Sequence, residues 1–205
     1  MLSARMLRLA GWSALGTIIL AFLVLSGLIY FKVNELVHRD MAEWFRDDYG
    51  RLPLMVFIIS ASILEYLMML FQLYVIRNYY KLRLRYSKYD ILLLLACLLA
   101  FISTLLYVRH ILDGSGLESP APYTVIISCV VALLGGIWLL LVPGNMFKLK
   151  KPLAWTCILY GVLSVVIYLE VVGLVFGLVH YILLVKFFFR AAKNEEWLAT
   201  QQQTT

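Results

Sequence analysis

The sequence predicts an all-α fold, a polytopic membrane bundle of six transmembrane helices joined by short loops. Hydrophobic residues make up 63% of the chain and charged residues only 15%, whereas soluble domains have about 45–50% and about 25%. The apolar residues gather in runs long enough to cross a membrane. Polar stretches separate these runs, and the most basic of them lies at residues 77–88. The whole chain, residues 1–205, is therefore expected to form a single integral membrane domain.

Clear polar breaks mark the first four spans, which are expected at about residues 9–31, 53–76, 91–108 and 123–142. The first follows Arg5 and Arg8, as in a signal peptide. Its apolar run is too long for a signal-peptide core and no A-x-A site follows, so we interpret it as an uncleaved span. Turn-forming residues precede the fourth span, and Pro143-Gly144-Asn145 ends it.

The last apolar segment, residues 152–189, has two interpretations. A single helix of this length would reach roughly 57 Å, nearly twice the thickness of the hydrocarbon core. Two spans at 153–169 and 171–189 would instead place Glu170 at a tight turn. The two-span interpretation puts the basic residues near residue 190 on the same side as the other basic loops. We therefore favour six spans, keep five as the alternative, and expect a disordered tail at 194–205.

The distribution of Lys and Arg predicts the orientation and the membrane. Cytoplasmic loops collect basic residues, so the N-terminus is expected in the cytoplasm and the protein in a bacterial inner (plasma) membrane. No separate basic domain exists, so nucleic acid is not an expected partner. Anionic lipid headgroups are an expected partner, because basic residues near the membrane surface attract them. The residues expected to anchor at headgroups are Arg77, Lys81, Arg83, Arg85 and Lys88.

Glu65 is the polar residue that points most clearly to function. It lies near the middle of the second span, where a carboxyl is costly and must face protein or water. Ser62 and Gln72 share its helical face, which makes a short polar stripe. One interpretation is a proton or ion relay, or a substrate contact. The other is a protonated carboxyl that donates a hydrogen bond to a neighbouring helix.

Glu170 and His180 form a second candidate pair on the last apolar segment. They do not lie on one helical face, so they do not form a simple pair of metal ligands. In the six-span prediction Glu170 is a hydrated turn residue. His180 then lies inside a span, where a hydrogen bond between helices is the usual role of a lone histidine.

No cofactor or metal is expected. His38, His110 and His180 do not share a depth in the membrane, which disfavours haem. The cysteines at 97, 129 and 157 fall in three different apolar runs and form no C-x-x-C pair.

Small residues at four-residue spacing predict close packing of helix backbones, within the bundle or between subunits. They are Gly173 and Gly177 in the last span, and Ser128, Ala132 and Gly136 in the fourth.

No hydrolase, protease or phosphate-binding motif is present, so the sequence does not favour an enzyme. We expect a non-enzymatic accessory subunit or an assembly or interaction factor of a membrane complex. Its partners would be other membrane-protein subunits or a second copy of the chain. The alternative is a small transporter or channel that uses Glu65.

Overall fold

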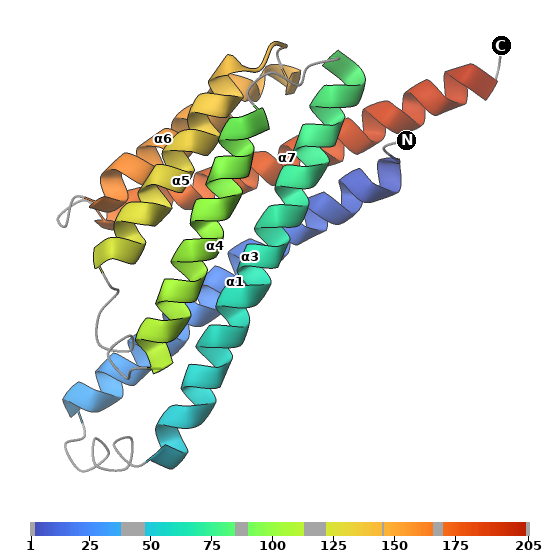
Figure 1. Ribbon diagram of the computed structural model, residues 1–205. Helices are drawn as coiled ribbons and strands as arrows, with labels where there is room; N and C mark the ends of the chain where they lie inside the picture. Colours follow the sequence, from blue (N-terminus) through green and yellow to red (C-terminus); the bar gives the residue numbers. More distant parts are fainter. Residues whose placement is uncertain are drawn as a thin grey trace.

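The computed structural model describes residues 3–37, 48–84, 90–112, 122–144, 146–165 and 170–203. Within these ranges the chain forms six α-helices and no strand (Figure 1). Five of them are long and apolar enough to cross a membrane, which confirms the predicted helical membrane bundle. The helices are α1 (Ala4–Val37), α3 (Asp48–Leu84), α4 (Asp90–Leu112), α5 (Pro122–Leu141), α6 (Lys150–Val165) and α7 (Glu170–Gln203), with a 3₁₀ turn, η1 (Met146–Lys148), before α6.

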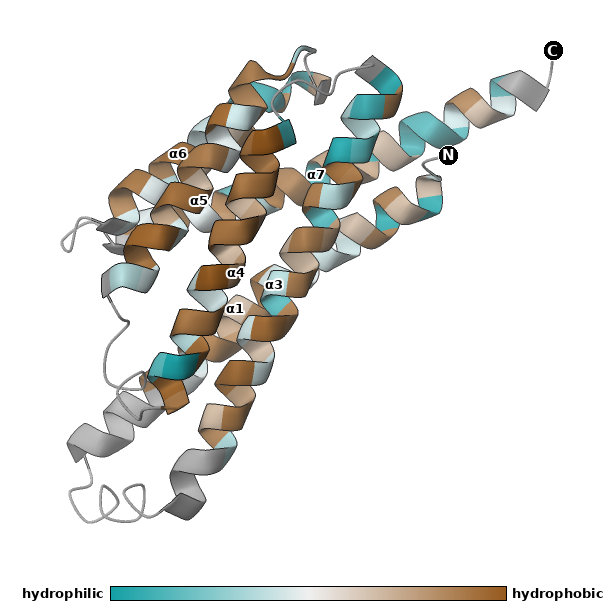
Figure 2. Ribbon diagram, in the orientation of Figure 1, coloured by the Kyte–Doolittle hydropathy of each residue, from teal (hydrophilic) through white to brown (hydrophobic). Residues whose placement is uncertain are grey.

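The helices extend beyond the apolar runs that predict them. Backbone groups inside hydrocarbon must pair within their own segment, which favours helix through each apolar run. The polar ends then continue the same hydrogen-bond pattern wherever they find a packing partner. Figure 2 shows this change along α3 and α7, which are apolar in their middle and hydrophilic at their last turns. Apolarity therefore predicts the membrane-crossing part of each helix and not its ends.

The prediction of a disordered tail at 194–205 is wrong for residues 194–203, because these residues continue α7. The end of α7 packs beside the start of α1, where Arg8 pairs with Glu196 at 2.6 Å. The sequence pattern of the tail alone does not reveal this contact.

The segment 152–189 forms two helices, so the single continuous helix considered as the alternative is wrong. Helix α6 ends at Val165 and α7 begins at Glu170, close to the predicted turn. The two helices are antiparallel, because Gly173 lies against Ser164 while His180 lies against Leu153. With 16 residues, α6 is the short helix of the bundle, about 24 Å long.

The end of α5 follows the predicted break. The helix ends at Leu141, just before Pro143 and Gly144. Gly144 has a φ of 94°, in the left-handed region that glycine adopts most easily. Lys150 then donates its ammonium to the Val142 carbonyl, which supplies a partner for an acceptor at the helix end.

The six helices form an antiparallel ring. Each helix packs on the next one in the chain, and α7 closes the ring by packing on both α6 and α1. In Figure 1 the end of α7 and the start of α1 lie next to each other, near the labels of the two termini. We call this side, where α1 begins and α3 and α7 end, the basic end. It holds most of the described Lys and Arg residues, among them Arg8, Arg77, Lys81 and Arg83.

Small residues bring α5 and α6 into close contact. A Cβ atom added at Gly136 would lie 2.5 Å from Cγ1 of Ile158 and 2.9 Å from the Ala154 carbonyl oxygen. A Cβ at Gly161 would lie 3.0 Å from the Cys129 carbonyl oxygen. In lipid no hydrophobic force drives helices together, so such close packing contributes directly to the association of α5 and α6.

Aromatic side chains fill the centre of the ring at the basic end. We call them the aromatic plug: Tyr79 and Tyr80 of α3, Trp138 of α5, and Phe187 and Phe188 of α7, all buried. Tyr80 meets Trp138 edge-on, with ring centroids 5.4 Å apart, and Tyr79 meets Phe187 at 5.5 Å. Edge-on pairs of this kind add to the free energy gained by burial.

We expect Gly136→Ala to lower the melting temperature in mild detergent, because the new methyl group overlaps both a side chain and a backbone carbonyl. Overpacking of this kind costs about 1–3 kcal/mol. The neighbouring Gly135→Ala is the matched control, since its Cβ would meet only Sγ of Cys157, at 3.8 Å. Equal melting temperatures for the two variants would contradict the close α5–α6 contact.

We expect Tyr80→Phe to keep or raise stability. The Tyr80 hydroxyl is buried and has no hydrogen-bond partner among the described residues, and a buried unsatisfied group costs about 1–3 kcal/mol. Tyr66→Phe is the control, because the Tyr66 hydroxyl donates to the Cys97 carbonyl at 3.4 Å. Thermal unfolding of both variants in detergent tests this. A larger loss for Tyr80→Phe than for Tyr66→Phe would refute it.

Candidate functional site

A cavity of about 480 Å³ lies inside the ring, on the side of the aromatic plug that faces away from the basic end. Side chains from α3, α4, α5, α6 and α7 line it, and no α1 side chain that the structure describes is among them. Trp138 of the plug lines the cavity as well, so the plug separates it from the basic end. Ligand sites usually have volumes of about 300–1,000 Å³, so the cavity has room for a small organic molecule.

Glu65 of α3 lines this cavity and has no hydrogen bond or ion pair within the part of the chain that the structure describes. It shares the cavity wall with three tyrosines from other helices, Tyr107 on α4, Tyr160 on α6 and Tyr181 on α7. No Lys or Arg is among the described lining residues. The carboxyl is therefore the acidic group of the site and has no cation beside it.

The small hydroxyl groups on the wall are engaged within the bundle. Ser62 donates to the Ile58 carbonyl at 2.9 Å, and Ser164 donates to the Tyr160 carbonyl at 2.7 Å. The hydroxyls of Ser103 and Ser128 lie 3.3 Å apart and join α4 to α5. Ser62 and Ser164 thus use their hydroxyl protons within the bundle and offer a ligand only acceptor lone pairs.

His180 connects α7 to the start of α6. Its Nδ1 lies 3.0 Å from the Leu153 carbonyl oxygen and 3.3 Å from the Thr156 hydroxyl. A carbonyl only accepts, so Nδ1 carries the proton, and in the neutral ring Nε2 remains an acceptor. The imidazole lines the cavity but is held by a hydrogen bond between helices.

Gln72 has a similar role on the opposite wall. Its side chain is 3% exposed, and Nε2 donates to the hydroxyls of Ser13 and Thr17, each at 3.2 Å. These bonds join α3 to α1. The predicted stripe of Ser62, Glu65 and Gln72 does line one cavity, but only Glu65 keeps its polar group unpaired.

The aromatic lining of the cavity was not identified from the sequence. It consists of Trp138 and four tyrosines, and no phenylalanine is among the described lining residues. Three tyrosine hydroxyls, those of Tyr107, Tyr160 and Tyr181, have no hydrogen bond to a described residue. Tyrosine normally gathers at the membrane interface. Tyrosines inside the spans are therefore the sequence feature that could have indicated this lining.

The other predicted site residues lie around this centre. Gly177, Ser128 and Ala132 line the cavity, whereas Gly173 lies against Ser164 of α6. Glu170 begins α7, and its side chain lies outside the described part. No group of three or more potential metal-ligating side chains occurs among the described residues.

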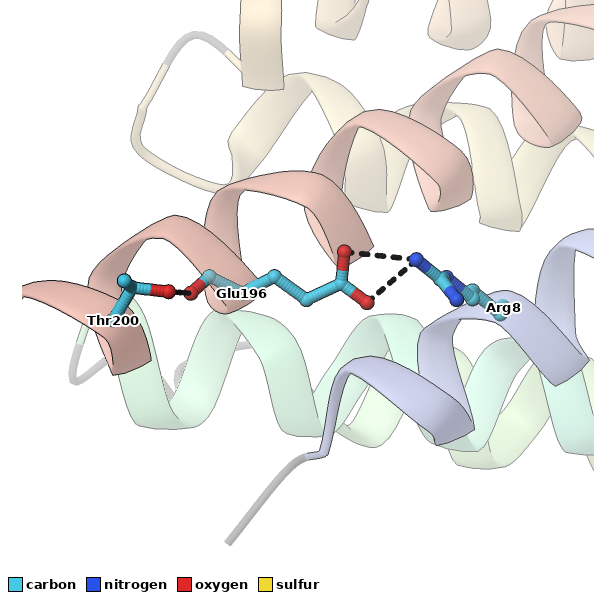
Figure 3. A network of polar contacts seen from close by, with 3 residues as sticks. All are labelled: Arg8, Glu196 and Thr200. Atoms are coloured by element: carbon cyan, nitrogen blue, oxygen red, sulfur yellow. Dashed lines mark hydrogen bonds and ion pairs between the residues drawn. The ribbon is translucent and has the colours of Figure 1, made fainter.

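Among the described residues, three ion pairs connect helices at the basic end. Figure 3 shows Arg8 of α1 beside Glu196 of α7, whose carbonyl accepts a hydrogen bond from Thr200 at 2.9 Å. Two of the predicted headgroup-anchoring residues also have carboxylate partners in the chain. Arg77 pairs with Asp90 at 2.7 Å, and Arg83 pairs with Glu195. Lys81 is exposed, and Arg85 and Lys88 lie outside the described residues.

Comparisons of the chain with protein-family models, with curated proteins and with solved structures find no match. The cavity and Glu65 are therefore the features of this chain that bear on its function.

Proposed function

We propose that this integral membrane protein binds a small molecule in the cavity inside its ring of helices and acts as a small transporter or channel. The observation that carries the proposal is the Glu65 carboxyl, which lines the cavity and has no partner among the described residues. An ionisable group within a membrane span is by default a candidate for a substrate or ion pathway.

The contrast with the other polar residues of the spans supports this role. Gln72, His180 and Ser62 each have a hydrogen-bond partner inside the chain. A carboxyl used only to hold helices together would be expected to have one too, because an unpaired buried polar group is costly. Glu65 does not, and it faces a space large enough for a ligand.

A role as an accessory subunit or assembly factor, which the sequence favours, makes no use of this cavity. Such a protein needs a surface for its partner and gains nothing from an unpaired carboxyl in its interior. The cavity is thus the reason for preferring ligand binding over the accessory role.

We place the protein in a bacterial inner membrane with its basic end in the cytoplasm, as the excess of Lys and Arg there suggests. Exposed basic residues such as Lys81 are positioned at the level of anionic lipid headgroups in this orientation. Arg77 and Arg83 contribute less to lipid binding than expected, since carboxylates already neutralise them.

Single cysteines test the orientation. In a background with alanine at positions 97, 129 and 157, we expect Leu112→Cys to react with an impermeant maleimide on intact cells. Lys81→Cys should react only after the cells are permeabilised. Both positions are exposed and lie at opposite ends of the bundle. Labelling of both from outside would contradict the orientation.

Cavity filling tests the function. The protein, purified from its native membrane in mild detergent, should show in native mass spectrometry a bound small molecule that Gly135→Phe removes. Gly135 lines the cavity, and its Cβ would meet only Cys157, at 3.8 Å. Gly27→Phe is the matched control, because its Cβ would meet only Leu54, also at 3.8 Å, away from the cavity.

An adduct that persists in Gly135→Phe would place binding elsewhere. Stoichiometric co-purification of other membrane subunits, with no small molecule bound, would favour the accessory role and overturn the proposal.

A further inference from the structure

We infer that the ligand of this cavity is a monovalent organic cation with an apolar or aromatic body, and that Glu65 is its counter-ion. The inference rests on the proposed function and adds to it the chemical class of the ligand. Three properties of the cavity support it: the sign of its charge, the kind of aromatic residue on its wall, and its size.

The charge of the cavity favours a cation. Glu65 is its acidic residue, and neither Lys nor Arg is among the described lining residues. His180 uses Nδ1 for the Leu153 carbonyl, which leaves only an acceptor on the neutral ring. An anion would meet a carboxylate with no compensating cation. An organic cation would instead form the ion pair that Glu65 lacks, and an ion pair with few water molecules around it is strong.

The aromatic lining favours the same class of ligand. Aromatic faces attract cations, most strongly those of tryptophan and tyrosine. Trp138 lines the cavity on the side of the plug, and Tyr107, Tyr160 and Tyr181 line it from three helices other than that of Glu65. The chain has 11 phenylalanines, yet none of the described ones lines the cavity. The wall therefore combines π faces with hydroxyl groups around a single carboxyl.

The size of the cavity and its apolar wall exclude a bare metal ion. A volume of about 480 Å³ is far larger than one ion needs, and no cluster of three or more ligating groups occurs among the described residues. Leucine and isoleucine side chains cover much of the rest of the wall, at positions 73, 76, 93, 139 and 184. They suit a hydrophobic body that carries the positive charge.

Tetraphenylphosphonium and tetraphenylborate provide the test, because they have nearly the same size and opposite charge. Equilibrium dialysis against the purified full-length protein in detergent measures the binding of each. We expect the phosphonium ion to bind, the borate ion not to bind above the level of empty micelles, and Gly135→Phe to abolish binding. Glu65→Gln should weaken phosphonium binding by about tenfold or more, since it removes the charge and keeps the shape.

Substitutions at Tyr107 separate the aromatic face from the hydroxyl group. Tyr107→Phe keeps the face and should bind the phosphonium ion almost as well as the natural protein. Tyr107→Leu removes the face and should weaken binding by about three- to tenfold. Melting temperatures of all variants show whether each one folds. The comparison of the two ions on the natural protein needs no variant, so the test holds even if Glu65→Gln fails to fold.

Three results would overturn this inference and leave the proposed function intact. The first is equal binding of the two ions. The second is phosphonium binding that Gly135→Phe abolishes and Glu65→Gln does not change. The third is a bound neutral or anionic molecule that Gly135→Phe removes in native mass spectrometry. If Gly135→Phe affects neither the ions nor any adduct, the proposed function fails together with the inference.

Discussion

Close backbone contact at small residues on one side of the ring determines the shape of the whole bundle. Inside a membrane, helices gain little by hiding apolar surface, so association depends on close packing and hydrogen bonds. Glycines at 136, 161, 173 and 177 allow this contact between α5, α6 and α7. The apolar parts of α3 and α4, residues 53–84 and 90–112, contain no glycine at all. The ring is thus tightly packed on one side, and the cavity lies between that side and the helices that carry larger side chains.

The polar residues of the spans divide into two groups with different energetic roles. Gln72 joins α3 to α1 and His180 joins α7 to α6, so each stabilises a helix pair by satisfying its own hydrogen bonds. Glu65 and three tyrosine hydroxyls have no such partner among the described residues. Leaving buried polar groups without a partner costs free energy. Such a cost is expected at a site where a bound ligand supplies the missing contact.

The sequence predicted the fold better than the site. Apolar runs and polar breaks gave the helices and the turn before α7, because these depend on local composition. Composition did not predict that the tail is helical, because the end of α7 packs against α1 through the contact between Glu196 and Arg8, which lie far apart in the chain. Glu65 was recognisable because a carboxyl in an apolar run is rare. Tyr107, Tyr160 and Tyr181 were missed, because whether a residue faces lipid or the cavity depends on how the ring closes.

The distribution of buried residues around the cavity also bears on how a ligand reaches Glu65. Toward the basic end, passage requires separating the aromatic plug and the large hydrophobic cluster that surrounds it. The three ion pairs there are partly exposed and add little resistance of their own. Toward the other end, the described hydrophobic cluster is much smaller, with Ile58 of α3 and Ile111 of α4 at its centre. Among the described residues, separating α3 from α4 there exposes less buried apolar surface than opening the plug, and for them it costs correspondingly less free energy. For the ligand binding proposed above, the described part of the chain thus offers its path of lower cost between α3 and α4, with the plug as the barrier toward the basic end.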